Sequence, residues 1–500
     1  MGMFGALKRI FGGRAARGSA AAPIRGSYDA ARTSGQNTQH WTNADAYDAD
    51  AANSKTIRQR LCQRSRYEEE NNGFAKGGVL TQAHYVVGRG PKLRVQTASR
   101  GMNAMVEAAW NRWCKAVKLS RKLRTAVKAK TRDGEAFLLV RQNPRLPDRV
   151  QLDLTGIECE QIQSTDLGFN DPYRIDGVRF DEWGNVLEYD LLPAHPGGAW
   201  TQLNVQAQRV PARFMLHLFR EDRPGQHRAV PETTPTLNLF ASGRRFREAT
   251  VAAAENIANF SVMLKTQAPP NEEADLARPF TGTPIEKGMF VALPFGNDVF
   301  QPKAEQPAAS YDQFTRAQIN EQARPLSQPY NIAAADSSGY SFSGGRLDHL
   351  TYFVAVDTDQ ADIEDLVLDP LFDLWFAEAV AVYGWTFEAS PVPPHTWDWP
   401  ARPQIDDLKT ANARERNLST GMISLRRAYA EDGFDFEDEL PALAEDYGVT
   451  PEEMRRLLLE RNIRGNRPVE SPPAEDDEPA PAPRNRLAAL AGNNGNGRSK

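Results

Sequence analysis

The spacing of hydrophobic residues changes along the first half of the chain from helical to alternating. Apolar residues recur every three or four positions in 43–87 and in 102–132, which predicts helices in both segments. Alternating runs follow, and the clearest is a hairpin in which 177–181 and 185–190 flank a compact glycine turn. Shorter alternating runs predict further strands at 92–96, 135–141, 150–154, 157–162 and 214–219. This half is therefore predicted to mix helices and strands.

The second half returns to mainly helical spacing. A helical pattern runs from 234 to about 264 and another from 311 to 323, and between them lies a proline-rich segment with short strands at 288–293 and 298–301. A long apolar stretch at 347–382 contains Pro370, which is expected to restart or kink the helix. Further helices are predicted at 406–417, 424–430 and 450–461. The fold class predicted from this order is α+β, mainly helical.

A loop of small residues, NIAAADSSGYSFSGG at 331–345, separates the helix at 311–323 from the long apolar stretch. Loops of this length inside a folded region are uncommon, and they are usually functional or disordered. This loop is anchored at both ends and carries no dominant chemistry. It suits contact with something that slides past, and it points away from an enzyme with a substrate pocket.

Charge is unevenly distributed, although the net charge is only −5. Residues 112–132 carry nine Lys and Arg and no acid, whereas 347–401 carry eleven Asp and Glu and neither Lys nor Arg. These blocks predict complementary surfaces, either within the fold or between copies of the chain. Each block also suits a solvated helix face. The net negative charge argues against a protein that coats DNA non-specifically.

Candidate chemistry is sparse. Cys62, Cys114 and Cys159 are far apart and form no CxxC pair, which argues against disulfides and a structural zinc site. The histidines show no HxxxH or HExxH spacing, and His217 alternates with apolar residues in its strand, so we assign it a structural role. No phosphate-binding GxxxxGK motif or GxSxG elbow occurs. We therefore expect no catalytic residue, cofactor or metal, and no apolar run long enough to span a membrane is present.

Several motifs, in this order, resemble the lambda-type bacteriophage portal proteins. They are RQRLCQRSRYEEENNGFAKGGVLT from Arg58, YVVGRGPKL from Tyr85, DGEAF from Asp133, WGNVLEY from Trp183, FREDRPGQHRAVP from Phe219 and YSFSGGR from Tyr340. The resemblance covers residues 40–465. It departs at Gly344 and Gly345, where the family usually has Ala or Ser, and glycine there is expected to loosen the start of the following helix.

The resemblance implies a ring of roughly twelve subunits at one capsid vertex, closed by head-to-tail contacts. Such a ring gates DNA entry, docks the packaging terminase and later holds the head-to-tail connector. The segments it implies are a disordered arm (1–40), a wing with helices and strands (41–233), a stem helix (234–266), a clip (267–309), a second stem helix (310–325), a tunnel loop (326–345), the long wing helix and its exit (346–403), a lower wing and helical crown (404–465) and a disordered tail (466–500).

The same resemblance implies the functional residues and the partners. The DNA-facing residues of the tunnel loop would be Asn331, Ala335, Ser337, Ser338, Tyr340, Ser341 and Ser343. Candidate subunit-interface residues are Arg121, Arg124 and Lys128 on the basic block, with Asp362 and Asp365 on the acidic one. Expected partners are other copies of the chain, double-stranded DNA, the terminase large subunit, the major capsid protein and a head–tail connector, with no membrane. The chain would be assembled in the host cytoplasm and reside in the virion.

Two alternatives stay open from the sequence. One is a nucleic-acid-binding adaptor that uses the basic face at 112–132, and the other is a phage-associated enzyme. A ring is distinguished by its mass in light scattering, whereas an adaptor would show tight, salt-sensitive binding of free duplex by the isolated chain.

Overall fold

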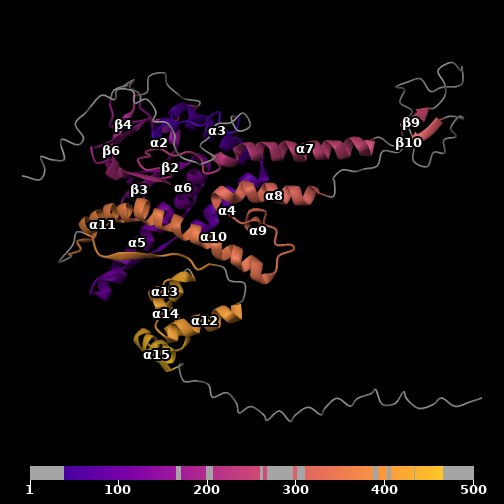
Figure 1. Cartoon of the computed structure of the whole chain (residues 1–500). Coiled ribbons are helices and arrows are strands. Elements are labelled where there is room, and N and C mark those ends of the chain that lie inside the picture. Colours follow the sequence, from indigo (N-terminus) through magenta and orange to yellow (C-terminus); the bar gives the residue numbers. More distant parts are fainter. Residues whose placement is uncertain are drawn as a thin grey trace, which may run out of the picture.

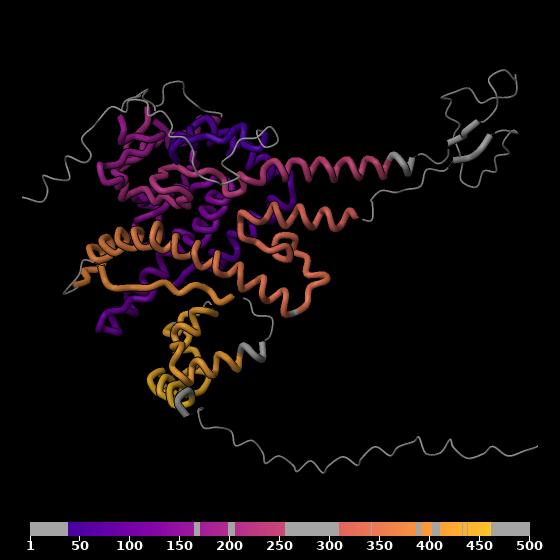
Figure 2. Tube along the Cα trace, viewed as in Figure 1, coloured from indigo at the N-terminus to yellow at the C-terminus, as the bar shows by residue number. Residues whose placement is uncertain are grey.

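The computed structural model describes residues 39–164, 171–198, 206–259, 263–266, 297–300, 310–386, 392–402, 407–432 and 434–464. Its body consists of helices packed around small antiparallel sheets, and a pair of helices projects from it (Figures 1 and 2). None of the helices within these ranges is long and apolar enough to cross a membrane.

The first helices confirm the predicted stop near residue 72. Helices α2 (Ala49–Ala52), α3 (Lys55–Asn71) and α4 (Gly73–Val86) follow one another, and α3 is separated from α4 by Asn72 alone. The Asn72 side chain accepts a hydrogen bond from the backbone N–H of Phe74 at 3.2 Å. This bond satisfies a donor that the first turn of a helix otherwise leaves unpaired, so the corner is stabilised where α4 begins.

The single helix predicted at 102–132 is two helices, α5 (Arg100–Val117) and α6 (Leu119–Asp133). They meet at Lys118, whose φ of 57° lies in the left-handed region and interrupts helical hydrogen bonding. A left-handed residue costs roughly 1 kcal/mol. The break lets Val117 and Leu119, on either side of it, both point into the core, where each is almost fully buried. Burial of these two side chains offsets the cost.

The strands form separate antiparallel sheets. In the three-stranded sheet, β2 (Glu135–Gln142) lies between β3 (Leu152–Ile157) and β8 (Met215–Phe219). The four-stranded sheet contains β4 (Arg174–Ile175), β5 (Val178–Phe180), β6 (Val186–Leu191) and β7 (Gln208–Pro211). The β5–β6 hairpin was predicted correctly. The strand predicted at 157–162 is wrong, because β3 ends at Ile157 and a 3-10 turn (Cys159–Gln161), closed by a Glu158–Gln161 capping box, follows it.

A buried cluster of charges fixes β2 to the loop that precedes helix α7 (Leu237–Asn259). Glu135, at the start of β2, contacts Arg228 at 2.6 Å and His217 at 3.2 Å. The Arg228 guanidinium, followed by the bonds from His217 and Arg228, holds the pKa of Glu135 well below its usual range despite burial. Burial lowers the pKa of His217, whose Nδ1 lies 3.4 Å from the hydroxyl of Tyr189. The structural role predicted for His217 is confirmed.

The long apolar stretch forms one extended helical element across the body. It consists of α10 (Phe342–Ile363), a π-helical turn η6 (Glu364–Leu368) and α11 (Asp369–Tyr383). The predicted irregularity at Pro370 is confirmed, because the wider π-turn ends at Leu368, two positions before this residue, which has no N–H to donate.

Helix α11 anchors this element in the core. Phe372 and Trp375 pack edge-on against Trp110 of α5, with ring centroids 5.4 and 5.0 Å away. Strand β11 (His395–Asp398) pairs with β1 (Lys92–Val95) beside this cluster, and its Trp397 adds a further ring. Large aromatic side chains in edge-to-face contact contribute strongly to a core.

The projecting pair consists of α7 (Leu237–Asn259) and α8 (Tyr311–Ala323), which run antiparallel (Figure 1). The predicted bounds of α8 are confirmed. The prediction that the first helix continues to 264 is wrong, because β9 (Met263–Thr266) pairs there with β10 (Asn297–Phe300). The predicted strand at 298–301 is thus confirmed, while its expected partner at 288–293 lies outside the described residues.

Four helices close the described chain: α12 (Asp407–Ser419), α13 (Leu425–Glu431), α14 (Phe436–Asp446) and α15 (Pro451–Arg464). Three of them were predicted, and α14 was missed because it contains Pro441, which argues against a helix when pattern is the only guide. Phe436, Leu440 and Met454 form a separate small core there. This C-terminal helical unit lies below α10 in Figure 1.

Candidate functional site

The segment that joins α8 to α10 contains less loop than the sequence predicted. A 3-10 turn η5 (Arg324–Leu326) and a short helix α9 (Tyr330–Ala333) come first, and only 334–341 remain before α10 begins. The hydroxyl of Ser341 accepts a hydrogen bond from the N–H of Gly344 at 3.2 Å and caps α10. Helix α10 therefore starts at Phe342 despite the two glycines expected to loosen it.

One arginine of the projecting pair holds this loop. Arg316, on α8, lies 3.4 Å from the carboxylate of Asp336 and donates to the carbonyl of Ser338 at 3.1 Å. Its guanidinium also lies 4.8 Å from the ring centre of Tyr330, whose hydroxyl donates to Asp336 at 3.2 Å. We call Arg316, Tyr330, Asp336 and Ser338 the loop latch. It ties the loop to α8 within one chain.

The latch also determines the charge of the loop. Hydrogen bonds from the side chain and backbone of Ser338, and further bonds from Tyr330 and Arg316, lower the pKa of Asp336 to about 2. Asp336 is therefore ionised at neutral pH, and it faces the cation of Arg316. The other residues of 334–341 are uncharged. The loop thus presents small neutral side chains, and its one acidic group is paired.

Most of the predicted loop residues are exposed to solvent. Ala335, Ser337, Ser338, Ser341 and Ser343 are exposed, and Tyr340 is half-buried. The backbone turns at Ala335 and Gly339, whose φ angles of 53° and 78° are left-handed. Asn331 differs from the others because it is buried in α9, below the first turn of α10.

The basic and acidic blocks meet inside the chain. Lys130 of α6 is buried, and its Nζ lies 2.7 Å from Asp359 of α10 and 3.1 Å from Glu232. Of the other basic residues, Arg112 contacts Asp148 and Arg124 donates to the carbonyl of Gly88 at 2.6 Å. These cations therefore have their partners within the same chain. The sequence had left open whether the partners lie in the same chain or in another copy.

The predicted interface residues differ in their exposure to solvent. Arg121 and Asp365 are exposed, whereas Arg124, Lys128 and Asp362 are half-buried. Asp362 and Asp365 belong to a cavity of about 550 Å³ where α10 passes the end of β8 and η5. Its other acidic lining residues are Asp359, Glu221 and Glu232, and the last two were not singled out in the sequence. Burial, reinforced by Asp359 and Asp365, raises the pKa of Asp362. We call this the acidic cavity.

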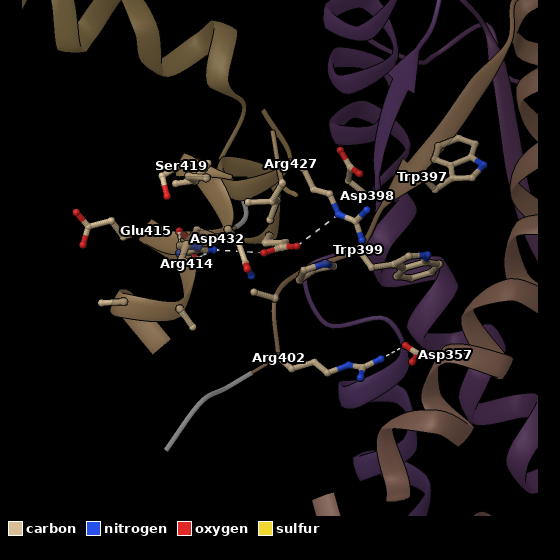
Figure 3. Close-up of a pocket in the computed structure, with 18 of the residues that line it drawn as sticks. Asp357, Trp397, Asp398, Trp399, Arg402, Arg414, Glu415, Ser419, Arg427 and Asp432 are labelled. Atoms are coloured by element: carbon tan, nitrogen blue, oxygen red, sulfur yellow. Dashed lines mark hydrogen bonds and ion pairs between the residues drawn. The ribbon is translucent and has the colours of Figure 1, made fainter. Parts of the chain in front are cut away.

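A larger cavity of about 1250 Å³ lies between the C-terminal helices and the body (Figure 3). Its charged groups mostly pair with one another: Arg402 with Asp357, and Arg414 with Asp432 at 2.7 Å. The first pair lies within the body and the second within the C-terminal unit, so each stabilises its own side of the cavity. Among the described lining residues they leave no evident cluster of free charges for a ligand.

Glu158, Glu160 and His195 offer potential ligand atoms within 4.8 Å of one another. Nδ1 of His195 accepts a hydrogen bond from the N–H of Gly197 at 3.0 Å, which places the ring proton of the neutral imidazole on Nε2. Nε2 faces Glu158 at 3.1 Å, and both oxygens of Glu160 already accept from Arg66 at 2.6 and 2.9 Å. A metal ligand needs a lone pair that this Nε2 lacks, so the geometry fits a corner held by the Arg66–Glu160 ion pair, with the His195 ring facing Glu158.

Comparison with known proteins identifies the family. The profile described as "Phage portal protein, lambda family" matches residues 34–360. The chain belongs to this family. Members of the lambda portal family are structural components of the phage virion rather than enzymes. Within this family, the chain is 25% identical over 481 residues to a "Probable portal protein" of Halomonas phage phiHAP-1, covering 88% of this chain and 90% of the relative.

Chains from solved structures of gene transfer agent (GTA) particles are also similar to this chain. One is titled "Neck of empty GTA particle computed with C6 symmetry", with a TM-score of 0.42 and 12% identity over 76% of this chain and 91% of that one. Another comes from the virion of a native gene transfer agent particle, with a TM-score of 0.38 and 11% identity over 78% of this chain and 94% of that one.

Proposed function

We propose that copies of this chain form a ring, of roughly twelve subunits, around a channel through which double-stranded DNA is packaged and ejected. The observation that carries this proposal is the exposed neutral loop at 334–341, which the latch holds against α8. In this assignment 334–341 and the first turn of α10 face the DNA, through Ala335, Ser337, Ser338, Tyr340, Ser341 and Ser343. Asn331 supports them from below.

The chemistry of the loop suits a conduit better than a binding site. Each phosphate contact by a cation strengthens DNA binding and makes it steeply dependent on salt, and such contacts would slow transport. In the loop the carboxylate of Asp336 is paired with Arg316, and small hydroxyl and methyl groups remain exposed. Such groups can contact a passing duplex without holding it.

The remaining segments receive the corresponding roles. Helices α7 and α8 form the stem, 267–309 the clip, 41–233 the wing, 346–403 the long wing helix and its exit, and 404–465 the lower wing and crown. The clip docks the terminase large subunit during packaging, and the assembled ring contacts the major capsid protein and a head–tail connector. Arg121, Lys128, Asp362 and Asp365 are each candidates for contacts between subunits.

The adaptor alternative loses its main support, because Arg112, Lys122, Arg124 and Lys130 of the basic block all contact partners within the protomer. A face whose cations are engaged in this way offers fewer of them to phosphates.

The proposal is tested by mass and by loop replacement. Light scattering and negative-stain images of the purified chain should show rings near twelve times 55.6 kDa. Replacement of 335–339 by a Gly-Ser linker of equal length should leave the rings intact and impair DNA packaging or retention. A matched replacement in the exposed turn 182–184 of the wing should leave both unchanged. Single particles without a hole would refute the ring, and normal packaging with the replaced loop would refute its role.

A further inference from the structure

Helix α10 is apolar on both of its sides. Tyr352, Val356 and Ile363 are buried against the body. On the opposite side Leu347, Leu350 and Val354 are 64%, 52% and 67% exposed. These three residues are spaced by three and four positions and form a continuous row on one face. A helix that is hydrophobic all round is normally covered all round, so this row is expected to have a partner.

The same face of the helical element becomes acidic toward its end. Asp365 is exposed on this face, and Asp362 flanks it at the mouth of the acidic cavity. No ion pair joins either carboxylate to another described residue. Burial is the main cause of the raised pKa of Asp362, and the nearby cations Lys130 and Arg220 offset it only in part. The partner of this face therefore needs apolar groups and positive charge.

Helix α3 carries a face of that kind. Ile57, Arg60, Arg64 and Tyr67 are all exposed and spaced by three, four and three positions, so they form one row. Ile57 and Tyr67 are 47% and 52% exposed, and they lie on either side of the two arginines. Among the described residues, neither guanidinium has an ion-pair or hydrogen-bond partner. The row offers two cations between two apolar groups.

The two rows lie on opposite sides of the protomer. Helix α4 packs between α3 and α10: Lys76 of α4 pairs with Glu69 of α3 at 2.8 Å, and the ring of Tyr85 meets Tyr352 of α10 at 5.2 Å. In Figure 1, α3 lies at the upper side of the body and α10 at the lower side. Two rows that point away from each other cannot meet within one chain.

We propose that the α10 row of one subunit, Leu347, Leu350, Val354, Asp362 and Asp365, binds the α3 row of the next copy, Ile57, Arg60, Arg64 and Tyr67. The inference rests on the proposed ring and assigns its subunit contact. Different patches on opposite sides of a protomer make a heterologous contact, which generates a ring when the rotation closes. Each apolar row then gains cover, and the two carboxylates gain two guanidinium groups.

The pairing is tested by reversing charge on each row separately. The variant R60E/R64E reverses the charge of the α3 row, and D365R/D362N reverses the charge of the α10 row. Each variant alone sets like charges opposite each other, so we expect about hundredfold weaker association by analytical ultracentrifugation. An equimolar mixture should recover rings, because every contact then joins opposite charges. The control R456E/R461E, on exposed positions of α15, should assemble as the unaltered chain does.

The outcomes separate the pairing from the ring itself. If the unaltered chain forms no rings, the proposed function fails before the pairing is tested. If the unaltered chain forms rings and both variants do too, the pairing is wrong and the ring stands. If each variant dissociates with an unchanged circular dichroism spectrum but the mixture stays dissociated, the two rows do not contact each other. Only dissociation of each variant together with recovery in the mixture supports the pairing.

Discussion

Lys130 is the single cation through which the basic block of α6 holds the acidic helix α10. Its side chain is 4% exposed, and those of its partners Glu232 and Asp359 are 6% and 14% exposed. Gln82 also donates to Asp359 at 2.7 Å. Replacement of Lys130 by methionine keeps the volume and the apolar stem but removes the charge. It leaves two carboxylates in the interior without their ammonium partner.

Loss of one partner from a buried ion pair typically costs about 3–5 kcal/mol, which is comparable to the whole free energy of unfolding of a marginally stable domain. Because the groups here are nearly inaccessible to water, no large reduction for solvent screening applies. At about 2–4 °C per kcal/mol, the melting temperature should fall by roughly 6–20 °C.

The pH dependence has a defined sign. The carboxylates of Glu232 and Asp359 raise the pKa of Lys130 above its ordinary value of 10.5, despite burial. Because the pKa of Lys130 is higher in the folded state, its stabilising contribution is fully present at pH values below the pKa of the unfolded state. The contribution is lost as the pH rises through the pKa of the folded state. The contribution of Lys130 should therefore be constant from pH 6 to about 9 and decline only in strong base.

The assay is thermal unfolding followed by circular dichroism at pH 7, with the exposed neighbour Lys115→Met as the control for loss of a lysine. A triple variant with Lys130→Met, Glu232→Met and Asp359→Leu should recover most of the loss, because an apolar replacement of a whole buried cluster is often neutral. A Lys130→Met protein that melts within about 1 °C of the control would refute the reasoning that this cation joins the two helices.

Two further predictions concern the loop latch and the buried carboxylate of Glu135. R316A should release the loop, so the amide hydrogens of 334–341 should exchange faster, while α8 keeps its protection and the rings persist. Arg245→Ala is the control. Unchanged exchange in R316A would contradict the latch. For Glu135, whose folded pKa is depressed, the stability contribution is complete above its unfolded pKa near about 4.3 and is lost as pH falls below it. The melting temperature of the unaltered chain should therefore fall steeply below about pH 4.5. E135Q should be less stable at pH 7, and its melting temperature should depend less on pH. Equal pH dependence of the two melting temperatures would contradict this account.

Local signals allowed much of the fold to be predicted, and residues distant in sequence account for most of the failures. The bounds of α8 and the β5–β6 hairpin follow from spacing and turn residues alone. The break at Lys118 does not, because a lysine carries no turn signal and adopts its left-handed φ only to let Val117 and Leu119 pack on the core. The same holds for α14, where tertiary contacts of Phe436 and Leu440 override an internal proline.

The candidate site shows the same division. The position of the loop and its neutral character were visible in the sequence, and so was the opposition of the basic and acidic blocks. Arg316 was not, because the contact with Asp336 crosses twenty positions and depends on where α8 ends relative to α9. Lys130 and Asp359 are 229 positions apart, so the sequence could not show whether the basic and acidic blocks pair within one chain.

The unequal lengths of α7 and α8 have a consequence for how the protein matures. Phe246, in the first half of α7, already packs against Tyr311 and Phe314 at the start of α8, and Val251 beyond it is 57% exposed. An unsupported run of about a dozen residues is a marginal helix in water. The outer turns of α7 should therefore become firmly helical only when other subunits surround them. In the proposed ring, assembly would also complete the folding of this segment, and the helical order of the segment should increase with protein concentration.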